Sequence, residues 1–195
     1  LQSKAFWGLR RLEVGLAQNV RRLQRWSLHW PLLLPTQRRL LARNRRWKGC
    51  YQGRRAFVVG NGPSLAKLDL RKLAGELVFT TNDFGCHPIL ASWKPAAHAL
   101  ADGAYFNQPD AYAGVFQRVR ERLGTGPVFM PAAVEPLIRT RGLLPEERCF
   151  YMEVLGNAAD FDWFDLDLAR AVPGVQTVTI LSCMAALYMG CSPIY

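Results

Sequence analysis

The sequence predicts an α/β domain of Rossmann-like architecture, a mostly parallel sheet with flanking helices, preceded by a basic helical N-terminal arm. Three observations predict it. From residue 54 onward, short apolar runs that end in polar residues alternate with helical patterns, which is the order of βαβ units. A glycine-rich turn follows the first of these runs. The excess of positive over negative charge is confined to the residues that precede this turn.

Charge and composition divide the chain into two parts. Residues 1–55 hold fourteen Lys and Arg against a single acid, Glu13, whereas the remainder holds eleven basic and fourteen acidic side chains. The net charge of +10 therefore belongs to an arm, which we assign to residues 1–52, and residues 53–195 form the globular domain. The five cysteines are scattered without a C-x-x-C pair, which indicates a reducing compartment rather than a disulfide framework or a zinc site.

The arm contains a helical pattern with two alternative roles. Its apolar residues recur at spacings of three and four between arginines, at Leu9, Leu12, Leu16, Val20 and Leu23. Such a helix can lie on an anionic membrane surface with tryptophans at the interface, or its leucines can pack on the domain or on a partner. No nucleic-acid-binding motif is present, so nucleic acid is not an expected partner. No stretch reaches the ~20 apolar residues of a membrane span, so we expect a cytoplasmic protein, free or peripheral on the inner face of the membrane.

The domain follows a strand–helix alternation from its first residues to its last. Strands are expected at 56–60, 77–82, 96–102, 127–130, 148–153 and 193–195, and helices at 63–74, 109–123, 132–140 and 177–189. The chain begins with Leu1 and stops inside the last strand pattern. We therefore expect a fragment of a longer protein, incomplete at its C-terminus.

The loop after the first strand reads "GNGPSL", residues 60–65. Its glycines permit a sharp turn and close approach to a ligand, and Pro63 suits the first turn of a helix, whose free amides and dipole favour a phosphate. The Walker A ending is absent, and Leu65 stands where the dinucleotide fingerprint has its third glycine. A plain turn explains the glycines but does not require an asparagine or a serine. We predict a phosphate-binding loop made of Gly60, Asn61, Gly62, Pro63 and Ser64.

Polar residues also follow the second and third strands. Asn82 and Asp83 come after the second strand, and Asp102 after the third. Ligands of parallel sheets bind beyond the carboxyl ends of the strands, so these side chains are predicted to meet the ribose or base, and Asp102 to hold Mg²⁺ if a metal is required. The alternative is that they cap helices and make turns. His98 falls inside a strand pattern and is expected to be a packed core histidine; His87 is a candidate acid–base group.

Residues 55–195 resemble two related families through "FVVGNGPSLAKLDL", "FTTNDF", "KPAAHALAD" and "ALYMGCSPIY". These are the bacterial CMP-sialic-acid-dependent sialyltransferases of lipooligosaccharide synthesis and the MptE-like 6-hydroxymethylpterin diphosphokinase family. The resemblance implies that Asn61 and Asn82 contact the donor nucleotide. It also aligns Thr177 with the first residue of a Thr-Ser-Gly stretch of the sialyltransferases. The sialyltransferases have an asparagine at the position of Asp102, whereas the MptE-like proteins tend to have an aspartate there, as this chain does. The catalytic histidine of the sialyltransferases lies downstream of the strand at which this chain ends, so no residue here inherits that role.

These observations predict the nucleotide-binding part of a transferase. The favoured activity is a glycosyltransferase of bacterial surface glycan synthesis that uses a nucleotide-activated donor, such as a CMP-sugar, and a glycan or lipid-linked acceptor. The loop amides, Asn61 and Ser64 would hold the donor phosphate, and Asn82 with Asp102 the ribose or base. Two alternatives remain. One is a Mg²⁺-dependent transfer of diphosphate from ATP to a pterin-type alcohol, with Asp102 as the metal ligand. The other is a non-catalytic domain that docks through its basic arm.

Overall fold

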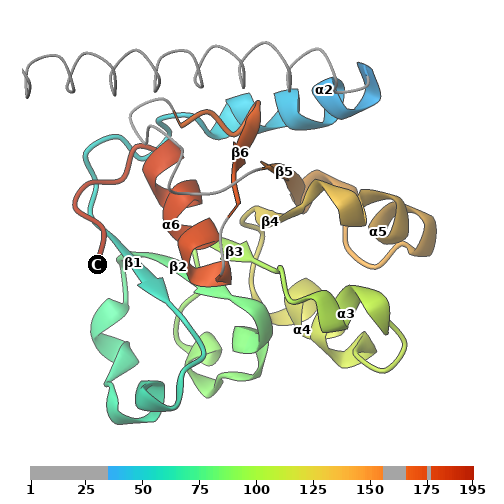
Figure 1. The fold of residues 1–195 in the computed structure, drawn as a ribbon. Helices are drawn as coiled ribbons and strands as arrows, with labels where there is room; N and C mark the ends of the chain where they lie inside the picture. Colours follow the sequence, from blue (N-terminus) through green and yellow to red (C-terminus); the bar gives the residue numbers. More distant parts are fainter. Residues whose placement is uncertain (1–34, 156–165, 175–176) are drawn as a thin grey trace, which may run out of the picture. The chain divides into compact units, whose positions relative to one another are not determined.

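A computed structural model describes residues 35–155, 166–174 and 177–195 of the chain (Figure 1). The predicted amphipathic helix of the arm and the three tryptophans proposed to lie at the membrane interface, Trp7, Trp26 and Trp30, are outside the described residues. The chain divides into two compact units, Leu1–Arg38 and Arg39–Tyr195. The helix α2 (Pro35–Ala42) crosses this boundary and is followed by the 3-10 helix η1 (Arg43–Trp47). Residues 39–52 of the predicted arm thus belong to the larger unit.

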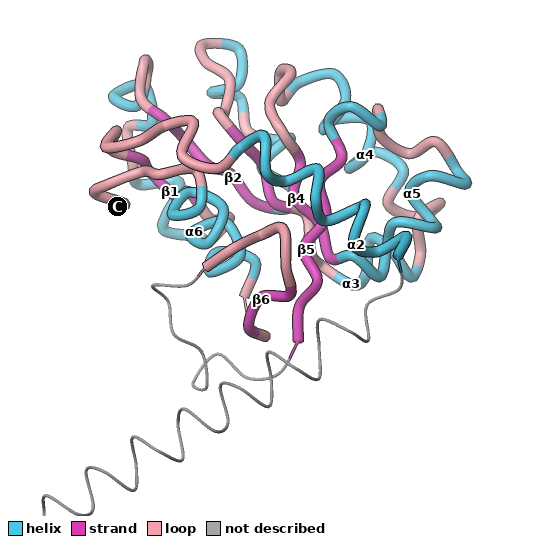
Figure 2. The backbone as a smooth tube through the Cα atoms, turned by 90° about the horizontal axis from the view of Figure 1, so that it is seen from above, coloured by secondary structure: helices cyan, strands magenta, loops and turns pink. Residues whose placement is uncertain are grey.

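The larger unit is built on a parallel sheet of six strands in chain order. Figure 2 shows the labelled strands following one another across the sheet. The predicted α/β fold with a parallel sheet and flanking helices is confirmed. The strands are β1 (Ala56–Val59), β2 (Leu77–Thr81), β3 (Ala97–Ala99), β4 (Val128–Pro131), β5 (Cys149–Leu155) and β6 (Ala171–Pro173).

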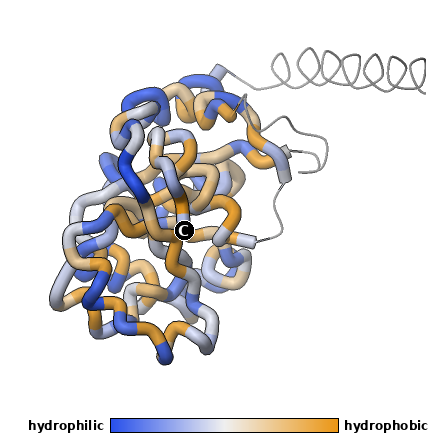
Figure 3. Tube along the Cα trace, turned by 90° about the vertical axis from the view of Figure 1, so that its left-hand side faces the viewer, coloured by the Kyte–Doolittle hydropathy of each residue, from blue (hydrophilic) through white to orange (hydrophobic). Residues whose placement is uncertain are grey.

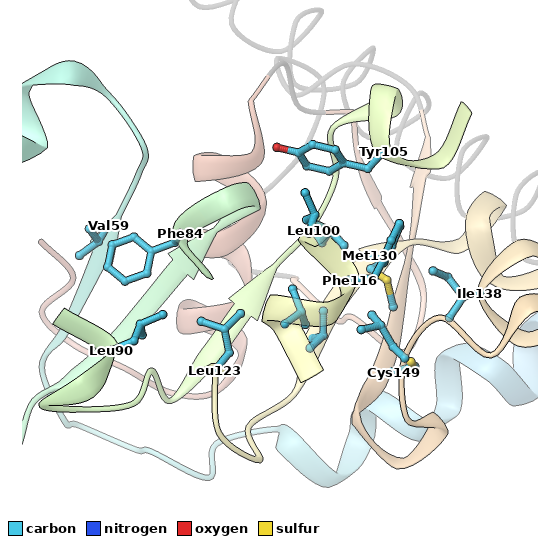
Figure 4. Packing of buried hydrophobic residues seen from close by; sticks show 14 of the residues in the cluster. Val59, Phe84, Leu90, Leu100, Tyr105, Phe116, Leu123, Met130, Ile138 and Cys149 are labelled. Carbon is cyan, nitrogen blue, oxygen red and sulfur yellow. The ribbon is translucent and has the colours of Figure 1, made fainter. Parts of the chain in front are cut away.

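The crossovers between β1 and β5 all pack on the same face of the sheet. Parallel strands in chain order are joined by crossovers of one hand, which places their helices on one side. Val59 and Met130 of the strands and Leu100, which directly follows β3, lie in one buried cluster with Phe84 and Phe116 of the crossovers (Figure 4). The crossover elements are η2 (Pro63–Lys67), η3 (Leu70–Leu73), η4 (Asn82–Cys86), η5 (Pro88–Ala91), α3 (Gly103–Asn107), α4 (Ala113–Arg122), η6 (Ala132–Val134), α5 (Glu135–Arg141) and η7 (Glu146–Arg148).

The opposite face is covered by α6 (Val178–Tyr188), which packs across β1, β2 and β3. Phe79, Phe129 and Phe150 of the strands meet Met184 of α6 in a second cluster. Figure 2 shows α6 and α4 on opposite sides of the strands, and Figure 3 shows apolar residues in the interior and hydrophilic residues at the periphery. None of the described helices is long and apolar enough to cross a membrane.

After α6 the chain returns to the free edge of β1. Tyr195 donates its amide to the carbonyl of Ala56 at 2.9 Å, and Val58 donates to the carbonyl of Tyr195 at 2.8 Å. The predicted strand at 193–195 is therefore present as a parallel bridge, with Ile194 opposite Ala56. β1 lies between β2 and this last segment, so the direction of winding reverses at β1, where parallel sheets bind ligands.

The predicted helix at 63–74 is wrong as a single helix. The segment forms two 3-10 helices, because Asp69 accepts a hydrogen bond from the amide of Arg71 at 3.2 Å and starts the second one, η3. Side chains of this type compete with a continuing helix by bonding the nearby backbone. The helix predicted at 177–189 is confirmed as α6, and β6 is a strand that the sequence did not predict.

Candidate functional site

Two asparagines link the carboxyl ends of the first three strands. The side-chain amide of Asn61 donates to the backbone carbonyl of Thr81 at 3.0 Å. The side-chain oxygen of Asn82 accepts from the backbone amide of Ala101 at 3.2 Å. In the described part of the chain, the Asn61 Oδ1 acceptor and the Asn82 Nδ2 donor have no hydrogen-bond partner. One acceptor and one donor therefore remain available to a ligand at this edge.

Asn82 also adopts a left-handed backbone conformation directly after β2. Its φ is +45°, and it is the one described residue other than glycine with a positive φ. A left-handed backbone costs most residues ~1–2 kcal/mol, whereas asparagine tolerates it. The tight turn from β2 into η4 thus favours an asparagine on structural grounds alone, alongside its predicted contact with a nucleotide.

The glycine loop lies against the start of α6. A Cβ atom built on Gly60 would stand 3.5 Å from Oγ1 of Thr179. Thr177 caps α6, and its hydroxyl accepts from the amide of Ile180 at 3.4 Å. Among the described residues, the loop amides of Asn61 and Gly62 make no hydrogen bond. Unpaired amides and the beginning of an eleven-residue helix therefore meet at one place, an arrangement that favours an anion.

This placement differs from the one predicted for the helix dipole. The sequence assigned the dipole to the helix that begins at Pro63, but η2 is only five residues long. The longer helix at the loop is α6, more than a hundred residues further along the chain. Thr179 was missed, and its signal is the Thr-Val-Thr stretch, residues 177–179, at the start of an apolar helix.

Asp102 lies at the same edge, three residues after β3. It caps α3, with its Oδ1 accepting from the amide of Ala104 at 2.9 Å, and its side chain is exposed. Its neighbour Ala101 is the residue bound by Asn82. The described residues contain no group of three or more His, Cys, Asp or Glu that could hold a metal. Asp102 is thus a single carboxylate, sufficient only for a metal that a nucleotide brings with its own phosphates.

Asp83 is not brought to this edge as a free carboxylate. Its Oδ1 accepts from Nη2 of Arg118 at 2.7 Å and from Nε at 3.2 Å, and its Oδ2 accepts from Sγ of Cys86 at 3.2 Å. The hydrogen bond to Asp83 raises the pKa of Arg118 above its ordinary value. The pair joins η4 to α4, and the predicted ligand contact of Asp83 stays a prediction.

The two histidines in the described part of the chain, His87 and His98, occupy structural positions. His98 is 2% exposed, and its Nδ1 lies 2.9 Å from the hydroxyl of Thr80. Burial lowers the pKa of His98 to about 3, so the imidazole is neutral and away from solvent, as expected of a core histidine. His87 Nδ1 accepts from the amide of Ile89 at 3.1 Å and caps η5. Neither ring projects from the strand ends as a free base.

One comparison with known proteins found a similar structure. No family model and no curated protein sequence matches the chain. A solved structure described as a MAf glycosyltransferase from Magnetospirillum magneticum AMB-1 is similar with a TM-score of 0.51 and 20% identity. The match covers 82% of this chain and 27% of the other. At this identity the likeness establishes a shared α/β fold, and the chain spans about a quarter of the length of the protein it matches.

Proposed function

We propose that residues 53–195 form the nucleotide-binding domain of a glycosyltransferase that takes a sugar from a nucleotide-activated donor. The observation that carries this proposal is the meeting of three strand ends, tied by Asn61 and Asn82, with the glycine loop and the start of α6. Ligands of parallel sheets bind at such a point. The description of the structural neighbour as a glycosyltransferase supports this choice among the classes that use nucleotides.

The donor phosphate would lie on the loop and the beginning of α6. The unpaired amides of Asn61 and Gly62 and the hydroxyls of Ser64 and Thr179 are the donors near that place, and Ser64 is exposed. The start of a helix carries about half a positive charge. Stabilising negative charge as it develops on the leaving phosphate is commonly the largest contribution to catalysis.

The ribose and base would lie further along the same edge. The Asn82 Nδ2 donor suits a carbonyl or ring nitrogen of a base, and the exposed Asp102 carboxylate suits ribose hydroxyls. The resemblance of "GNGPSL" to the sialyltransferases makes a CMP-sugar the donor we propose, with a glycan or lipid-linked acceptor of a bacterial surface glycan. We assign no base to deprotonate the acceptor within the described residues, because His98 is buried and His87 caps a helix.

The second candidate is transfer of diphosphate from ATP. The exposed carboxylate of Asp102 at the same edge favours it, because one carboxylate and the phosphates of a nucleotide are a common set of ligands for Mg²⁺. A non-catalytic domain with the same fold is the third, and nucleotide binding separates it from the other two.

A melting-temperature titration tests the proposal. The full chain is titrated with CMP, UDP, GDP and ATP, each with and without Mg²⁺, together with Asn61→Ala, Asn82→Gly and the control Gln117→Ala on α4. A ligand at 100 times its dissociation constant stabilises by ~2.7 kcal/mol. We expect a metal-independent shift with CMP that both asparagine variants reduce and the control keeps. A shift with Mg-ATP alone supports the diphosphokinase. The absence of a shift with any nucleotide contradicts both the glycosyltransferase and the diphosphokinase.

A further inference from the structure

A group of cations near the end of α6 has no role in the proposed function. No Asp or Glu occurs between Glu13 and Asp69. Within residues 39–55, Arg43 and Arg55 form ion pairs with Glu146 and Glu76. Between residues 43 and 55, four other cations are exposed and form no salt bridge among the described residues. These are Arg45, Arg46, Lys48 and Arg54, which we call the cationic surface.

The backbone beneath the cationic surface is held on the domain. The amides of Gly49, Tyr51 and Gly53 donate to three carbonyls at the C-terminal end of α6, at 3.0, 2.7 and 2.8 Å. The guanidinium of Arg46 lies 5.0 Å from the ring centre of Phe150 and 5.1 Å from that of Trp47. The charges are therefore carried by a segment that is hydrogen-bonded to the domain, and the guanidinium groups of Arg46 and Arg54 lie over aromatic rings.

The cationic surface lies away from the candidate nucleotide site. The site is at the start of α6, beside Gly60, whereas the segment that carries the cations binds the last residues of the same helix. Eleven residues of α-helix span roughly 16 Å. A role for these cations therefore does not depend on the proposed function.

The neighbouring side chains favour one kind of anionic partner. Leu187 is 43% exposed and directly precedes Tyr188, whose carbonyl binds Gly49. The aromatic residues of the segment, Trp47 and Tyr51, are half-buried and pack against the core. Single-stranded nucleic acid stacks its bases on accessible aromatic rings, whereas cations beside an exposed aliphatic side chain suit the headgroup boundary of a membrane.

We propose that the cationic surface docks the domain on a membrane that contains anionic phospholipids. The sign of its charge and the exposed leucine match the headgroups and the acyl boundary. The rest of the domain has more acidic than basic side chains, so attraction to such a membrane is greatest at this surface. This docking does not depend on the proposed sugar-transfer activity.

Vesicle co-sedimentation of the full chain tests this surface. The vesicles are phosphatidylcholine alone and phosphatidylcholine with phosphatidylglycerol. The triple variant Arg45→Gln/Lys48→Gln/Arg54→Gln removes three charges, and at about fivefold per charge its affinity for the anionic vesicles should fall about 100-fold. The control Lys67→Gln/Lys72→Gln/Arg139→Gln makes the same change in net charge elsewhere and should bind as the wild type does.

A further variant separates charge from structure. The variant Arg45→Lys/Arg54→Lys keeps the charge and should bind the anionic vesicles as the wild type does. Higher salt should weaken the binding of the wild type to these vesicles. Equal loss in the triple variant and its control would show that only net charge matters. Unchanged binding by the triple variant would place membrane contact elsewhere in the chain. Binding to a DNA oligonucleotide, lost in the triple variant and without any binding to anionic vesicles, would assign the surface to nucleic acid. Each of these results overturns the proposal.

Discussion

Replacing His98 by glutamine should flatten the dependence of stability on pH. His98 is 2% exposed, and burial lowers its pKa from 6.5 to about 3, so the folded protein keeps the ring neutral while the unfolded chain binds a proton below pH 6.5. Between these two values the unfolded state holds the extra proton. The free energy of unfolding therefore decreases as the pH falls through 6.5, by about 1.4 kcal/mol per unit.

The magnitude at mild acidity follows from the unfolded value alone. At about pH 5 the folded ring is still neutral, so the loss relative to neutral pH is about 2 kcal/mol. Urea unfolding of the wild type and His98→Gln, at about pH 7.5, 6 and 5, measures it. The difference between the two proteins isolates His98, because every other titrating group is shared. We expect the wild type to lose about 2 kcal/mol more than the variant over this range. Parallel curves would refute the buried, neutral state of His98.

Further substitutions test the packing, the buried hydrogen bonds and the backbone geometry of the domain. Gly126→Ala should destabilise by about 1–3 kcal/mol in urea unfolding, because its Cβ would lie 2.5 Å from the carbonyl oxygen of Ala96; Gly103→Ala, with 3.8 Å to its nearest neighbour, should not. Asn44→Ala should cost on the order of 3 kcal/mol, since its amide donates to two backbone carbonyls at 2.8 and 2.6 Å inside the core; an unchanged midpoint would contradict this. Asn82→Gly should be more stable than Asn82→Ala by about 1 kcal/mol, because glycine adopts the positive φ without strain, while both lose nucleotide affinity equally.

The fold class could be predicted because its signal is local. Apolar β-formers such as those of β1 and β2 recur between polar turns, and this alternation needs no information about distant contacts. β6 escaped prediction because Ala171–Pro173 is only three residues long and contains a proline. The strand order and the return of residues 193–195 to β1 depend on the packing of α6 across the sheet, which no local pattern reports.

In the candidate site, too, local sequence signals could be read in advance and long-range contacts could not. The polar residues at the strand ends were visible in the sequence, and the structure joins Asn61 and Asn82 to their neighbouring strands. Asp83 gave the same local signal as Asn82, yet its carboxylate is bound by Arg118, 35 residues away. The contact of Thr179 with the loop requires the chain to cross the whole sheet first. Local chemistry thus predicts candidates, and tertiary packing decides which of them meet.

The most direct test of the nucleotide site is the location of binding. Amide spectra of the isotope-labelled full chain are recorded during titration with the nucleotide that raises its melting temperature most. We expect the largest shifts on residues 60–65, on Asn82 and Ala101, and on the first turn of α6. Shifts confined to residues 39–55 at the opposite end of α6, or no shifts at saturating ligand, would contradict this expectation.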